Sequence, residues 1–220
     1  MATGRTDTPA TERGRDLMDW LQVNSRLLGA GAALIVVAMV GFWFYNRSQQ
    51  IRTVNAERQL ALAQQSLGSG NTSLALSDLQ RVATRYEGTA AGTEAAILLA
   101  QQLYDQGKFQ EGVSHLQKML DKAGASRANV QSLIADGLTQ MGKLGDAAKA
   151  YEQAAESAGR FEAEKAYYRA KAARTYTAAG NVAEAKRIWS DLANQEKSPS
   201  VAAEAKVRLA ELTAERAGRS

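Results

Sequence analysis

Residues 27–45 carry no charged side chain; they have the sequence LLGAGAALIVVAMVGFWFY and lie between Arg26 and Arg47. An α-helix rises about 1.5 Å per residue, so a helix of this length covers nearly the whole hydrocarbon layer of a bilayer. A helix also satisfies every backbone amide inside lipid. The aromatic residues at 42–45 are typical of the boundary between lipid and water. The run therefore predicts a transmembrane helix, and the alternative is a buried helix of a soluble domain.

The surroundings of this run predict an uncleaved signal-anchor. The aromatic end offers none of the small residues that a signal peptidase needs. The chain has no cysteine, which excludes acylation of an N-terminal Cys, disulfides and thiol chemistry. Residues 1–15 have the composition of a disordered tail. Residues 16–26, with Trp20, predict an amphipathic helix at the membrane interface or an N-terminal extension of the anchor helix. Arginines flank the run equally on both sides, so the charges do not decide its orientation.

After the run, a glycine recurs at intervals of about 35 to 38 residues, at Gly70, Gly107, Gly142 and Gly180. Each of these glycines follows one apolar-periodic segment and precedes another. Glycine adopts the left-handed backbone conformation freely and commonly ends helices for this reason. The spacing therefore predicts four helical hairpins stacked along residues 46–220, each turning at one of these glycines.

Small residues stand where the two helices of each hairpin would cross, and larger apolar residues surround them. The small pairs are Ala63 with Ala75, Ala100 with Gly112, Ala135 with Ala147, and Ala173 with Ala185. In the first hairpin Leu62, Leu79 and Val82 also fit the pattern. The arrangement resembles tetratricopeptide repeats, with an interval slightly longer than usual. That resemblance implies an all-α solenoid of about four hairpins, closed by a capping helix over residues 201–217 that follows Pro199.

No catalytic or cofactor-binding constellation is present in the sequence. The only histidine, His115, has no further metal ligands at matching spacing, and we expect it at a half-exposed position. Carboxylates such as Asp146 and Glu152 are mixed with Lys and Arg, as on solvated helix faces. No basic cluster with interleaved aromatics indicates nucleic-acid binding. We therefore predict a protein-binding module without enzymatic activity, cofactor or metal.

The first helices of the hairpins would line the concave side of such a stack, which we call the inner face. The pattern places nine candidate protein-binding residues there: Gln64, Leu67, Ile97, Gln101, Tyr104, Ser132, Asp136, Tyr167 and Arg174. An open groove with Ile97, Tyr104 and Tyr167 exposed would suit extended or partly folded polypeptides, with the two tyrosines as anchors. The alternative is that these residues pack against neighbouring hairpins.

Three stretches narrow the resemblance: YNRSQQ at 45–50, LLAQQLYD at 98–105 and WLQVNSR at 20–26. Together with the order of tail, anchor and repeats, they resemble the YfgM-type ancillary subunit of the bacterial SecYEG translocon. The resemblance implies a single-pass inner-membrane protein with a cytoplasmic N-terminus and periplasmic repeats. It also implies association with SecYEG and with a PpiD-type periplasmic chaperone, in handling newly exported proteins.

Two other functions stay open at the level of sequence. RYEGT at 85–89, leading into Ala95 and Ala96, resembles the helical repeats of periplasmic scaffolds for outer-membrane assembly and cell-division coordination. Those scaffolds are lipoproteins or secreted soluble proteins, which an uncleaved anchor and the absence of cysteine disfavour. A second alternative is an enzyme subunit whose chemistry resides in a partner.

Overall fold

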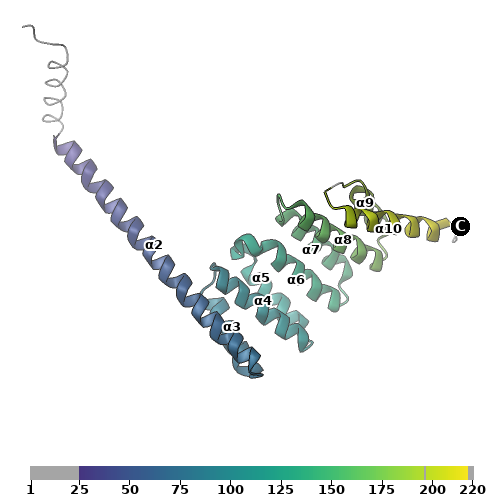
Figure 1. Ribbon diagram of the computed structural model, residues 1–220, viewed down its shortest axis with the longest axis horizontal. Coiled ribbons are helices and arrows are strands. Elements are labelled where there is room, and N and C mark those ends of the chain that lie inside the picture. Colours follow the sequence, from purple (N-terminus) through teal and green to yellow (C-terminus); the bar gives the residue numbers. More distant parts are fainter. Residues whose placement is uncertain (1–24, 196, 218–220) are drawn as a thin grey trace, which may run out of the picture. The chain divides into compact units, whose positions relative to one another are not determined.

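The computed structural model describes the backbone of residues 25–195 and 197–217, and the side chains of these residues except those of 25–30, 32, 33 and 215–217. Every element in these ranges is helical (Figure 1). The predicted tail at 1–15 and nearly all of the predicted interfacial helix at 16–26 lie outside the described residues. The chain divides into two compact units, Met1–Arg52 and Thr53–Ser220.

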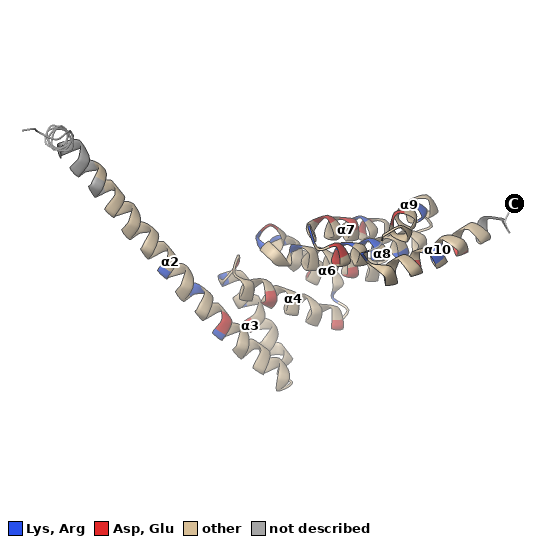
Figure 2. Cartoon of the chain, turned by 45° about the horizontal axis from the view of Figure 1, so that its top comes forward, with Lys and Arg blue, Asp and Glu red and all other residues tan. Residues whose placement is uncertain are grey.

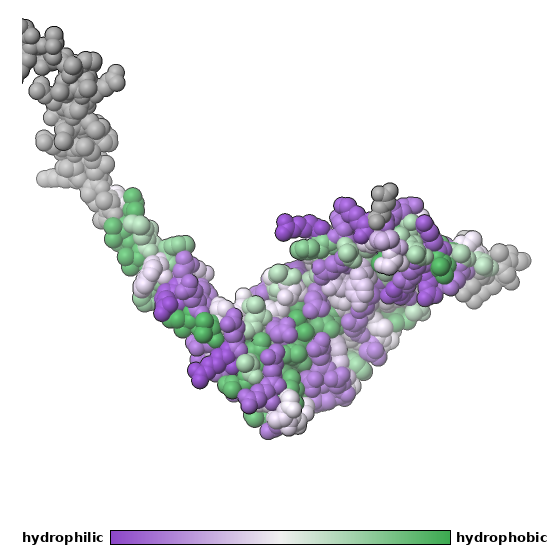
Figure 3. All heavy atoms as spheres, in the orientation of Figure 1, coloured by the Kyte–Doolittle hydropathy of each residue, from purple (hydrophilic) through white to green (hydrophobic). Residues whose placement is uncertain are grey.

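Helix α2 (Ser25–Gly68) passes through the boundary between the two units. In the first unit its apolar side chains from Leu34 to Tyr45 are exposed, with exposed fractions between 54% and 71% for the large ones. Figures 2 and 3 show this stretch of α2 without charged positions and with hydrophobic atoms along it. Among the residues that the structure describes, no helix combines the length and the apolar character that crossing a membrane requires.

The second unit is a stack of helical hairpins. The end of α2 pairs with α3 (Thr72–Arg85), α4 (Ala90–Asp105) with α5 (Phe109–Met119), α6 (Arg127–Gln140) with α7 (Leu144–Ser157), and α8 (Glu162–Ala178) with α9 (Val182–Ala193). Two short 3-10 turns, η1 (Leu120–Lys122) and η2 (Gly124–Ser126), connect the second hairpin to the third. Helix α10 (Pro199–Ala217) completes the stack.

The four predicted turn glycines each have positive φ, between 73° and 77°. At Gly107 the turn is a Schellman motif: Gly107 N–H donates to the Tyr104 carbonyl at 2.9 Å, and Lys108 N–H donates to the Leu103 carbonyl at 2.8 Å. These bonds satisfy carbonyls at the end of α4, and the left-handed residue reverses the chain into α5. The prediction of four hairpins turning at these glycines is confirmed.

The predicted small residues are all buried, which lets the two helices of each hairpin approach closely. Around them, one core cluster joins the first three hairpins through residues such as Leu79, Leu103 and Leu116. A second cluster joins the third and fourth hairpins to α10 around Ile188, Trp189 and Leu192. Each hairpin thus buries an apolar face that it could not cover alone.

The two ends of the stack differ. At the C-terminal end, α10 begins at Pro199 and covers the second cluster with Leu209 and Leu212, as the sequence predicts. At the other end, Leu62 is 48% exposed instead of packing into the first hairpin. Its apolar neighbour is missing because no further hairpin precedes α2 in the second unit.

Candidate protein-binding surface

The inner face is formed by the first helix of each hairpin together with α10. The structure places the nine predicted residues in three environments. Four are exposed, Gln64, Gln101, Tyr167 and Arg174; three are partly buried, Leu67, Tyr104 and Asp136; and two are buried, Ile97 and Ser132. The prediction that Ile97 is exposed on this face is therefore wrong. Ile97 is 5% exposed and belongs to the first core cluster, because the neighbouring helices cover it.

Tyr104 connects the second hairpin to the third. Its hydroxyl donates a hydrogen bond to the Leu133 carbonyl on α6 at 2.9 Å, and its ring lies 5.8 Å from the Phe109 ring. Burial of the ring, and then the negative charge of Asp136, raise the pKa of the Tyr104 hydroxyl above its ordinary value. Tyr104 is therefore a packing residue between hairpins and not an exposed anchor.

Lys171 organises the middle of the inner face, although the sequence pattern does not single it out. Its ammonium group lies 2.7 Å from Asp136 Oδ1 and 3.4 Å from Ser132 Oγ, both on α6. The same group lies 4.6 Å from the centre of the Tyr151 ring and 5.8 Å from that of Tyr167. In the sequence, Lys171 follows Asp136 by about one repeat, and the two residues belong to the first helices of neighbouring hairpins. This spacing is the signal that could have predicted the ion pair.

Tyr151 also contacts Asp136, since its hydroxyl donates a short hydrogen bond to Asp136 Oδ1. Burial, and then this bond, raise the pKa of Tyr151. Asp136 therefore holds a lysine and a tyrosine from two neighbouring helices. Its carboxylate is occupied by the protein's own side chains, so it offers little to a partner.

Arg174 forms the last link along the inner face. Its Nε and Nη2 donate to the two carboxylate oxygens of Glu204 on α10, at 2.7 and 2.5 Å. This bidentate pair raises the pKa of Arg174 and lowers the pKa of Glu204. On the inner face, Tyr104 thus joins α4 to α6, Lys171 joins α8 to α6, and Arg174 joins α8 to α10.

Tyr167 is the aromatic residue of the inner face that is left open. Its side chain is 50% exposed, while its ring lies 5.5 Å from that of Tyr168 and beneath the charge of Lys171. These neighbours hold the ring in place without covering it. An exposed aromatic side chain that is already positioned loses little conformational entropy when a partner packs on it.

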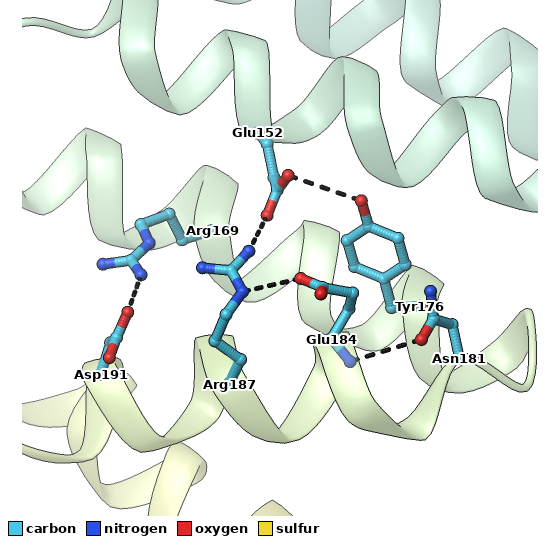
Figure 4. Close-up of polar contacts among 7 residues, drawn as sticks. All are labelled: Glu152, Arg169, Tyr176, Asn181, Glu184, Arg187 and Asp191. Atoms are coloured by element: carbon cyan, nitrogen blue, oxygen red, sulfur yellow. Dashed lines mark hydrogen bonds and ion pairs between the residues drawn. The ribbon is translucent and has the colours of Figure 1, made fainter.

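The charges between α7, α8 and α9 pair with one another (Figure 4). Arg187 lies 2.7 Å from both Glu152 and Glu184, and Arg169 lies 2.6 Å from Asp191. The Tyr176 hydroxyl donates to Glu152 at 3.4 Å. Partly exposed pairs of this kind contribute about 0–1 kcal/mol each to stability. This network makes the surface of the second helices polar. None of its residues is an exposed aromatic side chain comparable to Tyr167.

His115 is partly buried, as predicted, and burial lowers its pKa. It lines a cavity of about 190 Å³ with Glu87, Lys118 and Met119. Within the described part of the chain, no group of three His, Cys, Asp or Glu side chains is placed to hold a metal ion.

Known proteins share this architecture. Residues 18–135 and 59–171 match, in two overlapping alignments, the model of a family described as tetratricopeptide repeat-like domain. No curated protein matches the chain.

Two similar solved structures carry TPR-like repeats of a putative kinesin light chain from Podosopora anserina. The first is 19% identical, with a TM-score of 0.55, and the alignment covers 74% of this chain and 87% of that one. The second, a single-residue variant of the same protein, is 20% identical, with a TM-score of 0.54 and the same coverage. At this identity the likeness concerns the fold alone.

Proposed function

Because this chain belongs to the tetratricopeptide repeat-like domain family, we propose that it is a membrane-anchored protein-binding module of the export machinery. In this proposal it associates with the SecYEG translocon and assists a PpiD-type periplasmic chaperone in handling newly exported proteins. The family's repeat fold is a scaffold for protein–protein interaction. The observation that carries the proposal is Tyr167, an aromatic side chain held in place on the inner face and half exposed.

The inner face supports binding of extended polypeptides rather than of a charged ligand. Its charged side chains Asp136, Lys171 and Arg174 pair with neighbours of this chain. Among the nine predicted residues, Tyr167 offers an exposed ring, and Gln64 and Gln101 offer exposed amide groups. Amide side chains offer both a donor and an acceptor, as a polypeptide backbone does. Such a surface has no strict demand on the sequence of its partner, which suits newly exported chains.

The membrane anchor is supported by the uncharged run at 27–45 and by the exposure of its described side chains. Residues 34–45 cover more than three helical turns, so their exposed apolar side chains point to all sides of α2. In water this surface would cost free energy in proportion to its area, whereas hydrocarbon would cover it. Most side chains at the beginning of the run, before residue 34, are not among those that the structure describes. The periplasmic location of the repeats and the cytoplasmic N-terminus rest on the resemblance to YfgM-type proteins.

Site-specific photo-crosslinking in living bacteria tests the proposal. A photoreactive amino acid replaces Tyr167 on the inner face, and in a matched variant it replaces exposed Ser190 on α9. We expect position 167 to capture newly exported proteins and translocon components, and position 190 to capture far less. Recovery of outer-membrane assembly or division proteins at position 167 would favour the scaffold function instead. Equal capture at both positions would contradict a binding role of the inner face.

The same cells test the anchor. We expect the protein to stay with the membranes after a carbonate wash, and external protease to digest the repeats once the outer membrane is opened. A protein that is washed off, or repeats that resist protease until the inner membrane is broken, would contradict the proposed topology.

A further inference from the structure

A cavity of about 370 Å³ lies where α8, α9 and α10 meet, at the end of the inner face. Its apolar lining comes from Ala178, Trp189 and Leu212, and its polar lining includes Arg174 and Arg208. The volume is within the range of small ligand sites in proteins. It is large enough for one apolar side chain of a partner.

Several hydrogen-bond donors around this cavity are left over from the contacts within the chain. Trp189 is fully buried, and its indole Nε1 has no hydrogen-bond partner among the described residues. Arg174 uses Nε and Nη2 for Glu204, and Arg208 uses Nη1 for Glu211 at 2.9 Å. In the part of the chain that the structure describes, no acceptor contacts Arg174 Nη1 or Arg208 Nη2. Glu204 uses both of its carboxylate oxygens and Glu211 uses Oε2, so these guanidinium N–H groups are donors that a ligand can meet here.

Two arginines and two glutamates carry the charges at the cavity, and these charges sum to zero. They are Arg174, Arg208, Glu204 and Glu211. Glu204 pairs with Arg174 and lies 3.9 Å from Arg208, which in turn pairs with Glu211. An incoming carboxylate would find two carboxylates close to the arginines and would have to compete with them. A neutral carbonyl oxygen meets the same donors without this repulsion.

We propose that this cavity holds one apolar side chain of an extended partner polypeptide, whose adjacent main-chain carbonyl oxygen accepts an N–H from Arg174 or Arg208. This inference rests on the proposed function, because it assigns a subsite to the same inner face. Arg174 belongs both to the inner face and to the cavity lining. A polypeptide that crosses Tyr167 would therefore reach the cavity along α8. The preference is for an apolar residue, not for a chain terminus or an acidic side chain.

Peptide titration of the full-length chain in mild detergent tests the subsite. Trp20→Phe and Trp43→Phe leave Trp189 as the one indole, so its N–H resonance reports on the cavity wall. The probes are three acetylated and amidated ten-residue peptides of Gly and Ser, which carry Leu, Ser or Asp at two alternate central positions. We expect the Leu peptide to shift the Trp189 resonance saturably, and the Ser and Asp peptides to bind at least about tenfold more weakly.

Two variants locate the binding. Ala178→Phe, on α8, fills the cavity from an exposed position and should raise the Kd of the Leu peptide by about tenfold or more. Ala183→Phe, at an exposed alanine of α9 outside the cavity, should leave this Kd unchanged. An unchanged Kd in Ala178→Phe, or tighter binding of the Asp peptide, would overturn the subsite. Crosslinking from position 167 would then still show whether the proposed function holds.

Discussion

Replacing Trp189 by Ala is expected to lower the free energy of unfolding by about 3–5 kcal/mol, the usual cost of removing a large buried aromatic side chain. Trp189 is the largest fully buried side chain of the stack. It lies in the cluster that joins the last hairpin to α10, together with Ile188, Leu192 and Leu212. Its loss leaves a void that these neighbours cannot fill without moving α10. Urea unfolding followed by far-UV circular dichroism measures the change.

Trp189→Phe is the matched control. A phenyl ring keeps much of the buried volume, and it also removes an indole N–H that has no partner among the described residues. A buried donor without a partner costs about 1–3 kcal/mol, so its removal offsets part of the lost packing. We expect Trp189→Phe to lose less than half of what Trp189→Ala loses. Equal losses in the two variants would contradict both the packing role of the ring and the unpaired state of its N–H.

Gly137→Ala is expected to lower the free energy of unfolding by about 1–3 kcal/mol, although alanine normally favours a helix. A Cβ at Gly137 would lie closer than 3.0 Å to the Tyr104 hydroxyl and to a methyl group of Val113. The Tyr104 ring cannot move away easily, because Gly112 on its other side leaves similarly little room and its hydroxyl is bonded to Leu133. The second and third hairpins would have to separate.

Gly145→Ala provides the control for helix propensity. Gly145 lies in α7, and a Cβ there would meet no atom within 4 Å. The substitution should stabilise the protein by about 0.4–1 kcal/mol, since it reduces the freedom of the unfolded chain. The two glycine variants should therefore change stability in opposite directions when measured by urea unfolding. A stabilising Gly137→Ala would show that the Tyr104 contact between hairpins is loose.

The hairpins could be predicted from sequence because each depends on local requirements. A helix that reverses within a few residues needs a left-handed residue, and Gly107 and its three counterparts supply it. Two helices that cross closely need small residues, and Ala100 with Gly112 supplies one such pair. These requirements repeat at nearly constant spacing, which makes them visible in a single sequence.

The chemistry of the inner face could not be predicted in the same way, because it depends on how each hairpin sits against the next. A residue of a first helix faces either the inner face or the neighbouring hairpin. Which of the two it faces depends on how each hairpin is rotated against the next, and long-range contacts determine this rotation. Ile97 and Ser132 are covered by neighbours, while Tyr167 stays half exposed. The contact of Tyr104 with Gly137, a residue one repeat away, is one such determinant. The pattern within a single hairpin does not contain this information.

The link from Lys171 to Asp136 was missed for a related reason. Each residue alone is an ordinary charged side chain of a helix surface, and only their placement on neighbouring first helices makes them a pair. This pairing removes Asp136 from the surface that a partner can use. It also holds Lys171 over the Tyr167 ring, which is why a lysine absent from the predicted site helps to position its main aromatic residue.

The affinity of the full-length chain for an unfolded polypeptide tests the binding role of the inner face most directly. Fluorescence anisotropy with a labelled protein that cannot refold compares the original chain with Tyr167→Ser and with Phe161→Ser. Phe161 provides the matched control. It is an aromatic residue that is 60% exposed, and it lies at the turn before α8, outside the predicted inner face. We predict that Tyr167→Ser raises the Kd by about tenfold and that Phe161→Ser leaves it nearly unchanged. An unchanged Kd in Tyr167→Ser, with the fold intact by circular dichroism, would contradict a binding role of the inner face.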